Sequence, residues 1–492
     1  MNLFKNLKKI KAYVAIAAGI NLVHTVYVFL RASYLNTQIP FWYSFPWGES
    51  QLAQKEAIYL LPILAWLVLV FGVLIALGAM QYHIRYGKET ISLLVIAFCI
   101  TLFMSSVRII FVASLPFEPL INPLLLKMVF LLLTTALLSI LISRKVIDLM
   151  VDNGIVTDPG RHKHPGMVLI KPSARGGGLI FAFSFVLMTL LFVPMNKFVF
   201  VLILAVIISS LLGLADDVQN TKPNTPLKFL ENPIIRLCAQ IVIAGFIAFS
   251  GFTIDFVSNP FDGVLFLNNA NITLLGLTFA PLSILITILW LTWMMNMLSW
   301  SNAIDGQYSG VMGIASIALV VLTLRPGFDN SILAKDTLAT LAIIMAGASL
   351  GILPFNWHPS KIMWGFGAIS IGLLFATLSI ATRAKVPASI FVILIPFMDG
   401  VVTLLRRVLQ GKFPLKADKG HLHHLLLDRG WGIKKIAIFY WVTTALFAVV
   451  AIMIADRNLP TLMLTGGGIV AFLIIIVNLQ AKRLKLKQQQ AE

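Results

Sequence analysis

Two adjacent carboxylates, Asp216 and Asp217, stand at the end of a long apolar run. The run begins at Phe198, and a polar stretch that includes Asn220 and Lys222 follows the acids. Neighbouring carboxylates repel each other unless a cation or a basic group lies between them. Mg²⁺ that clamps phosphates is a candidate, because this ion takes a few carboxylate oxygens together with substrate phosphates. A solvated helix end with two acids is the alternative, and this stretch alone leaves both open.

A basic loop over residues 152–178 precedes the pair. It contains Arg161 and His164, and Arg175 stands directly before three glycines at 176–178. Glycines let backbone N–H groups approach a phosphate closely, and a helix N-terminus favours anions. The loop therefore fits phosphate binding, and a plain basic loop with a flexible glycine joint remains the alternative.

Two further polar stretches contain amides, and the first of them also contains an acid. Asn302 and Asp305 are three residues apart, and Gly306 follows them, so the two side chains share one helical face. An amide and a carboxylate suit the recognition of a nucleobase or sugar edge, or the completion of a metal shell. Asn356 lies in the polar junction 355–361 between two apolar runs.

A histidine cluster ends the series of polar stretches. His421, His423 and His424 follow Arg406 and several lysines. Three histidines with a nearby acid could bind zinc. The surrounding Lys and Arg side chains instead favour diphosphate binding and proton transfer.

The composition indicates what must position these groups. The chain has 492 residues, of which 59% are hydrophobic and 12% charged, and its mean hydropathy is +0.91. Soluble domains are about 45–50% apolar and about 25% charged. We therefore expect an all-α polytopic membrane protein, because helices satisfy their own backbone hydrogen bonds in lipid. The net charge of +18 fits basic cytoplasmic loops and an anionic lipid or nucleotide as partner. The sequence has no basic-aromatic module of the kind that would indicate nucleic-acid binding.

Apolar runs of spanning length predict about fourteen transmembrane helices. Lysines near the start predict a cytoplasmic N-terminus, and an even number of crossings then places the C-terminus and the five polar stretches on the same face. The basic loop at 382–385 counts against this scheme. Turn residues in the loop 252–278 predict a short hairpin. The expected spans are 12–31, 57–80, 91–114, 122–143, 176–195, 198–215, 234–251, 279–299, 309–325, 336–354, 365–382, 387–405, 437–455 and 461–480.

Together, the five polar stretches resemble those of the polyprenyl-phosphate N-acetylhexosamine-1-phosphate transferases (glycosyltransferase family 4 type). The resemblance covers roughly 122–480 and keeps the order of the motifs. Asp216 to Asn220 is similar to the paired-aspartate motif, Asn302 to Gly306 to the Asn-x-x-Asp-Gly motif, and Phe355 to Gly365 to the Phe-Asn-x-x-Pro stretch. His421 to His424 matches the His-x-His-His loop of the teichoic-acid and O-antigen branch better than the three-histidine run of the lipid I branch.

The resemblance implies a division into an accessory extension of about three helices, 1–120, and a transferase domain, 121–492. It implies transfer of a sugar-1-phosphate, an N-acetylhexosamine, from a UDP-sugar to undecaprenyl phosphate, with release of UMP. The reaction would lie at the cytoplasmic face of a bacterial membrane and start cell-wall or surface-polysaccharide synthesis. The oligomeric state is not indicated.

The resemblance also implies roles for individual residues. Mg²⁺, with Mn²⁺ as an alternative ion, would bind Asp216, Asp217 and Asp305. The expected catalytic residues are these three acids and His423. The expected substrate-binding residues are Arg161, His164, Arg175, Asn220, Asn302, Asn356, Arg406, His421 and His424.

Two positions depart from the family pattern. Tyr308 stands where the family has a second Asp, three residues after Asp305. Phe366 stands where the Phe-Met-Gly-Asp motif of the family has its acid. These departures motivate a second hypothesis, a non-catalytic relative that binds the polyprenyl carrier or scaffolds polymer assembly. A transporter is a third, but the acids cluster at one face and not at the bilayer midplane, where transporter sites lie.

Overall fold

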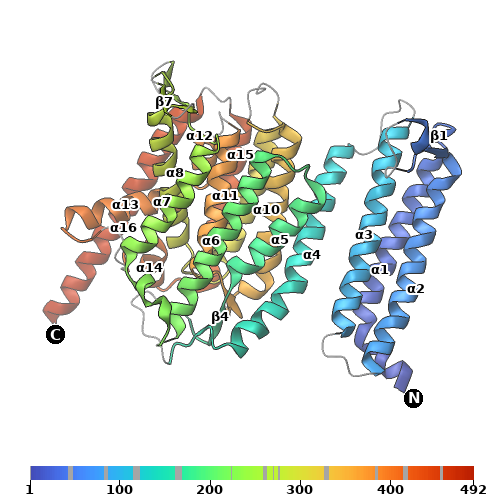
Figure 1. Ribbon diagram of the computed structural model, residues 1–492. Coiled ribbons are helices and arrows are strands. Elements are labelled where there is room, and N and C mark those ends of the chain that lie inside the picture. The colour runs from blue at the N-terminus through green and yellow to red at the C-terminus, as the bar shows by residue number, and fades with distance from the viewer. Residues whose placement is uncertain are drawn as a thin grey trace. The chain divides into compact units, whose positions relative to one another are not determined.

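The computed structural model is built almost wholly of helices (Figure 1). It divides into two compact units, Met1–Leu126 and Lys127–Glu492. The structure describes residues 2–42, 48–81, 87–114, 122–160, 169–222, 224–258, 263–269, 271–274, 277–325, 332–382, 386–413, 419–454 and 458–491.

The first unit packs three long helices around an apolar core. Short strands β1 and β2 pair antiparallel at one end of them. His24 on α1 and Ser106 on α3 are fully buried, and the His24 Nε2 atom lies 2.7 Å from the Ser106 Oγ atom. This hydrogen bond joins two helices within an otherwise apolar interface. The elements are α1 (Asn2–Ala32), β1 (Gln38–Pro40), β2 (Leu52–Gln54), α2 (Leu60–Gln81) and α3 (Gly87–Ala113).

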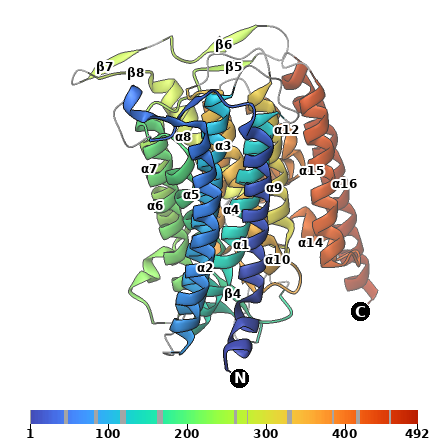
Figure 2. The same cartoon turned by 90° about the vertical axis from the view of Figure 1, so that its right-hand side faces the viewer.

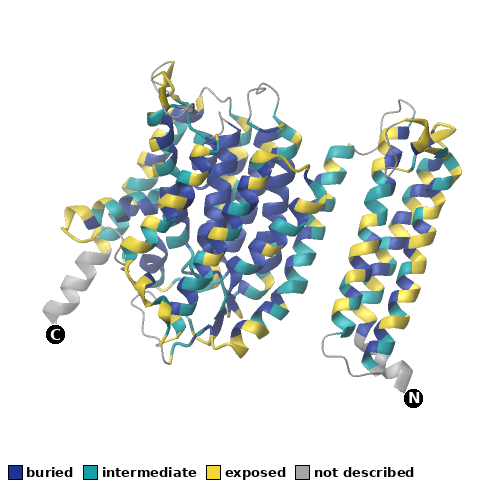
Figure 3. Ribbon diagram, in the orientation of Figure 1, coloured by how far each residue is buried: buried dark blue, intermediate teal, exposed yellow. Residues whose placement is uncertain are grey.

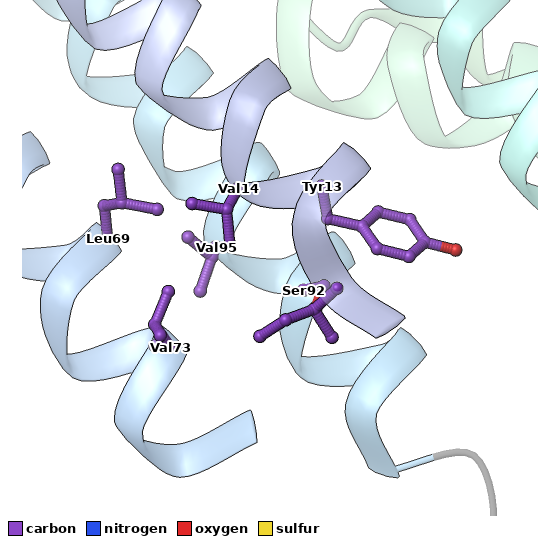
Figure 4. Close-up of a pocket in the computed structure, with 8 residues that line it drawn as sticks. Tyr13, Val14, Leu69, Val73, Ser92 and Val95 are labelled. Atoms are coloured by element: carbon purple, nitrogen blue, oxygen red, sulfur yellow. The ribbon is translucent and has the colours of Figure 1, made fainter. Parts of the chain in front are cut away.

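A small pocket lies between the three helices of the first unit. Figure 4 shows the Tyr13 hydroxyl pointing away from the other labelled side chains. The pocket lining is almost entirely apolar, so it offers no group for catalysis or ion binding. Its residues are Ile10, Tyr13, Val14, Leu69, Gly72, Val73, Ser92 and Val95.

The second unit is a bundle with a fully buried centre. Figure 3 shows buried residues concentrated in α10 and α11, whereas outer helices such as α4 and α7 expose many apolar side chains. Such a distribution suits outer helices in contact with lipid. The helices are α4 (Pro123–Asp152), α5 (Gly177–Phe192), α6 (Lys197–Thr221), α7 (Pro233–Phe249), α8 (Pro281–Trp300), α9 (Gln307–Leu324), α10 (Lys335–Asn356), α11 (Ala368–Ala381), α12 (Val386–Val392), α13 (Leu394–Leu409), α14 (Leu422–Leu427), α15 (Ile433–Met453) and α16 (Leu459–Ala491).

Short strands mark the two ends of this bundle. Two antiparallel hairpins, β5–β6 and β7–β8, lie together at one end, so the predicted hairpin in 252–278 is confirmed (Figure 2). At the opposite end, β4 pairs antiparallel with β3 and parallel with β9. The strands are β3 (Val156–Thr157), β4 (Ser173–Arg175), β5 (Phe256–Ser258), β6 (Val264–Phe266), β7 (Ile272–Leu274), β8 (Leu277–Phe279) and β9 (Ile362–Met363).

Ten helices of the described residues are long and apolar enough to cross a membrane, which confirms an all-α polytopic membrane protein. The predicted span 387–405 is not one straight helix, since α12 and α13 meet at 88°. Pro396 explains the break, because a proline ring clashes with the carbonyl four residues earlier, here at Val392. With this bent pair counted as one span the number rises to eleven. Three further described helices are apolar but shorter. The count of fourteen and the cytoplasmic termini stay predictions.

Three glycines let the backbones of the second unit meet near β9. Gly178 on α5 and Gly213 on α6 both face the backbone of Gly367, in the short helical turn η4 (Gly365–Gly367). A Cβ atom at Gly213 would overlap the Gly367 backbone. These contacts press the turn that starts at Gly365 against the end of α6.

Gly213→Ala is therefore expected to lower the free energy of unfolding by about 1–3 kcal/mol, the usual cost of overpacking. The matched control is Gly245→Ala on α7, where the nearest atom to an added Cβ is the Ile288 Cδ1 atom at 3.9 Å. Thermal unfolding of the purified protein in detergent measures both. Equal melting temperatures for the two variants would contradict the close packing.

Candidate active site

Asp216 lies in the last turns of α6 with both carboxylate oxygens in hydrogen bonds. Asp216 is only 2% exposed. The Arg236 guanidinium on α7 donates to Oδ1 at 2.9 Å, and the Asn220 amide donates to Oδ2 at 2.7 Å. A buried carboxylate is stable only with such partners, so Arg236 supplies the neutralising charge.

Asp217 is held by a second guanidinium and by a backbone amide. Arg175 Nη1 donates to its Oδ1 atom at 3.2 Å, and the Phe366 N–H donates to the same oxygen at 3.1 Å. Asp217 is 1% exposed. Three segments far apart in sequence, β4, α6 and η4, therefore meet at this carboxylate.

The local backbone explains how these donors arrive. Arg175 ends β4 opposite Met363 of β9, and its Nε also donates to the Thr157 hydroxyl on β3. Gly365 follows with a positive φ of 59°, where a Cβ atom would overlap the Asp217 carboxylate. Only glycine lets this turn aim the Phe366 N–H at Asp217.

Phe366 contacts the other arginine of the site. The Arg236 guanidinium carbon lies 5.3 Å from the centroid of the Phe366 ring. A guanidinium over an aromatic face is attracted by the ring quadrupole. The ring that replaces the expected acid thus holds Arg236 in place beside Asp216.

Tyr308, the second departure from the family pattern, belongs to the core. It is fully buried, its hydroxyl donates to the Ala368 carbonyl at 2.8 Å, and its ring meets Trp364 edge to face at 5.3 Å. The Trp364 indole N–H donates in turn to the Ser309 hydroxyl at 2.7 Å. Tyr308 therefore braces the segment that leads to η4.

Asn302 and Asp305 serve different neighbours. Asn302 Nδ2 donates to the Gly365 carbonyl at 3.3 Å, which ties it to the turn beside Asp217. The Asp305 Oδ2 atom lies 2.7 Å from His358 Nδ1 and accepts the Ser360 N–H at 3.2 Å. Asp305 thus organises the loop after α10.

The three-acid metal site predicted from Asp216, Asp217 and Asp305 is not assembled. Among the residues that the structure describes, no group of three His, Cys, Asp or Glu side chains lies close enough to hold a metal ion. Asp305 is paired with His358. Asp216 and Asp217 are each paired with an arginine. Mg²⁺ prefers oxygen ligands and retains several waters. This buried, guanidinium-paired arrangement does not fit a Mg²⁺ ion held by the protein.

Asn356 and Arg406 hold backbone segments. The Asn356 carbonyl accepts the Gly306 N–H at 3.2 Å, and its amide donates to the Ile362 carbonyl at 2.9 Å. Arg406 Nη1 donates to the Gly420 carbonyl at 2.8 Å, just before the histidines. Both residues therefore shape loops, and their predicted contacts with substrate stay predictions.

A second cluster surrounds the histidines, at the same end of the bundle as β4 (Figure 1). Asp399 on α13 accepts the Leu422 N–H at 2.7 Å, and its other oxygen lies 2.9 Å from His421 Nδ1. On the far side of this imidazole, Nε2 lies 3.4 Å from Arg407 Nη2. The Arg407 guanidinium carbon is 5.4 Å from the ring centroid of Trp300, two residues before Asn302. The two clusters therefore adjoin the end of α8.

Sequence reasoning did not assign site roles to Asp399, Arg407, Arg236 and His358. The signal that could have found Asp399 is its place inside the apolar run 387–405, because ionisable groups within spans are costly and functional by default. Arg161 and His164, by contrast, were predicted to bind substrate but lie outside the described residues.

His423 and His424 are neutral imidazoles near pH 7. Burial, with the nearby His421, lowers the pKa of His423 well below its ordinary value. His423 is 1% exposed, and neither ring nitrogen has a hydrogen-bond partner among the described residues. Unpaired buried nitrogens are costly, so this imidazole is suited to meet a ligand group or to move a proton.

Acid is expected to destabilise the histidine loop. Burial lowers the pKa of His424 from 6.5 to about 4, so the unfolded chain takes up a proton at a higher pH than the folded one. The stability that the neutral ring contributes is present above pH 6.5 and is lost as the pH falls towards about 4. Melting temperatures of wild type and His424→Gln across this range test it. A parallel decline in both proteins would contradict the expectation.

Residues 199–383 match the model of glycosyl transferase family 4. This part of the chain is similar to that family. The family 4 match contains Asp216, Asp217, Asp305 and both departures from the pattern, whereas Arg175 and the histidines come from outside it.

The chain is also similar to several curated proteins over part of their length. A Mycolicibacterium smegmatis decaprenyl-phosphate N-acetylglucosaminephosphotransferase is 28% identical, over 39% of this chain and 52% of that protein. A Bacillus subtilis protein named probable undecaprenyl-phosphate N-acetylglucosaminyl 1-phosphate transferase is 25% identical, over 50% of this chain and 63% of that protein. A Caldanaerobacter subterraneus phospho-N-acetylmuramoyl-pentapeptide-transferase is 28% identical, over 54% of this chain and 79% of that protein. The chain thus spans less than two thirds of the first two.

Proposed function

We propose that this protein transfers a hexosamine phosphate from a UDP-sugar to undecaprenyl phosphate and releases UMP. The observation that carries the proposal is the buried Asp216–Asp217 pair, which two guanidinium groups neutralise at the same end of the bundle as the histidine cluster. The names of the relatives, which act on polyprenyl phosphates and N-acetylhexosamines, support the same reaction class. The lysines before the first span place this end, in our proposal, at the cytoplasmic face of a bacterial membrane.

The proposed reaction is one phosphoryl transfer. An oxygen of the lipid phosphate attacks the β-phosphorus of the UDP-sugar, and the bond from that phosphorus to the bridging α–β oxygen breaks. The bridging oxygen leaves with the uridine as UMP, and the sugar-1-phosphate remains on the lipid phosphate. Catalysis of such a step depends on positioning and charge neutralisation.

The residues of the site have distinct roles in this proposal. Arg175 and Arg236 donate hydrogen bonds to phosphate oxygens that approach the pair. Asp217 orients the attacking lipid phosphate and holds Arg175 beside it. His423 accepts or donates a proton, since its imidazole is neutral and its ring nitrogens have no hydrogen-bond partner among the described residues. Arg407 and His421 contact the diphosphate.

The test is UMP release from a panel of UDP-N-acetylhexosamines by the purified protein with undecaprenyl phosphate. We expect UMP from at least one sugar, and none when the lipid phosphate is left out. Mg²⁺ should be varied from zero, because the arrangement of the acids supports no metal-bound step. No UMP from any sugar, with or without Mg²⁺, would refute the proposal.

A second function is favoured by one observation, the contact of Phe366 with Arg236. We propose as the alternative that the protein binds the polyprenyl phosphate carrier without transferring sugar. Undecaprenyl phosphate binding that persists in the absence of any UMP release would favour this alternative.

A further inference from the structure

The charges around the paired acids of α6 balance without an ion. With both carboxylates ionised, Asp216 and Asp217 contribute −2 and their partners Arg175 and Arg236 contribute +2, so the sum is zero. We infer that these two guanidiniums occupy the place of a divalent cation at the pair, and that the protein without substrate binds no divalent cation there. The inference concerns ion binding by the protein alone, so it is independent of the proposed function.

Three of the four carboxylate oxygens already accept hydrogen bonds from the protein. Both oxygens of Asp216 accept hydrogen bonds, one from Arg236 and one from Asn220. Oδ1 of Asp217 accepts two, from Arg175 and from the Phe366 N–H. A cation would have to displace these donors, and the two guanidiniums would repel it at short range.

The burial of the two acids also disfavours a bound cation. Mg²⁺ needs near-octahedral oxygen coordination and keeps several of its waters. The residues Asp216 and Asp217 are 2% and 1% exposed, so little water reaches them to complete an ion's shell. A guanidinium does not need such a shell of water, because its N–H donors are held in a rigid, planar geometry that matches a carboxylate.

Phe366 makes the replacement durable. Its ring supports the Arg236 guanidinium from the side, 5.3 Å from centroid to guanidinium carbon, while its backbone N–H binds Asp217. An acid at this position would change the sum of charges from 0 to −1 and remove the ring from Arg236. One residue therefore both excludes an additional ligand and secures the arginine.

The experiment is titration with Mn²⁺, followed by the electron paramagnetic resonance signal of the free ion, on the full chain in detergent without nucleotide or lipid phosphate. We expect no wild-type site that depends on Asp217 and has a Kd below about 1 mM. Phe366→Asp is expected to create a site at least about tenfold tighter than in Phe366→Asn, its uncharged control of equal size. Arg236→Gln is a second route to a net charge of −1 and is expected to bind Mn²⁺ more tightly than wild type.

One wild-type Mn²⁺ per chain that is lost in Asp217→Asn would overturn the inference. Mn²⁺ that remains bound in Asp217→Asn lies elsewhere and agrees with it. Because Mn²⁺ binding is measured without substrate, the Mn²⁺ titration and the UMP assay can each succeed or fail independently of the other. UMP release with no Mn²⁺ site at the pair supports both proposals, and a Mn²⁺ site that Asp217→Asn removes, without UMP release, refutes both.

Discussion

Asp217→Asn is expected to reduce UMP release by about 10²–10⁴-fold, the range of a lost acid–base or orienting group. The amide retains an oxygen that accepts the Phe366 N–H, which wild-type Asp217 receives at 3.1 Å. It lacks the charge that holds Arg175 and orients the lipid phosphate. The net charge of the pair and its two arginines rises from 0 to +1. We therefore expect a folded protein with an inactive site.

The matched control for this variant is Asp336→Asn. Asp336 makes the same kind of pair, with Lys127 at 2.7 Å, but its side chain is 58% exposed. An exposed ion pair contributes little to stability, so UMP release by this control should equal that of wild type. A rate of Asp217→Asn within about threefold of wild type would remove the residue from the chemistry, since even a modest catalytic group gives far more.

Asp399→Ala is the second change with a large expected effect. Asp399 is buried, accepts the Leu422 N–H and binds the His421 imidazole. Each lost hydrogen bond to a charged group costs about 1.5–3 kcal/mol of unfolding free energy. We expect a lower melting temperature, faster hydrogen exchange in Leu422–Leu427, and loss of UMP release because His421 loses its carboxylate partner.

Asp399→Asn separates structure from positioning. Its amide oxygen can still accept the Leu422 N–H, so the helix start should remain protected from exchange. UMP release should still fall, because the carboxylate that holds His421 Nδ1 is gone. Wild-type exchange and wild-type activity in Asp399→Ala would show that this carboxylate has no role in the histidine loop.

The sequence alone located the paired acids but not their partners. Asp216 and Asp217 stand out because carboxylates at the end of an apolar run need an explanation. Their arginines lie 20 and 42 residues away. The pairing depends on how α6, α7 and the sheet of β4 come together, which no local pattern encodes.

The two departures from the family pattern show a different limit. Sequence comparison identifies Tyr308 and Phe366 only as lost acids. In the structure, Tyr308 packs against Trp364, and Phe366 lies against Arg236. These contacts join residues far apart in the chain, so their replacement roles emerge only in three dimensions.

Helices were predicted better than their breaks. The apolar run 387–405 was expected to form one span, although Pro396 within it is the signal for the bend after Val392. Asn356 is predicted to contact substrate, and the structure adds that its amide bridges Gly306 and Ile362. Polar residues in a loop look alike in sequence, whether they bind a ligand or the backbone of the loop.

The most direct test of the proposed transfer is the mass of the lipid product. Purified protein would be incubated with undecaprenyl phosphate and each UDP-N-acetylhexosamine, and the lipid fraction analysed by mass spectrometry. The proposal predicts a new lipid heavier than undecaprenyl phosphate by one N-acetylhexosamine phosphate, formed by wild type and Asp336→Asn but not by Asp217→Asn. Unchanged undecaprenyl phosphate with every sugar, in a wild-type protein that is folded and binds the lipid, would contradict it.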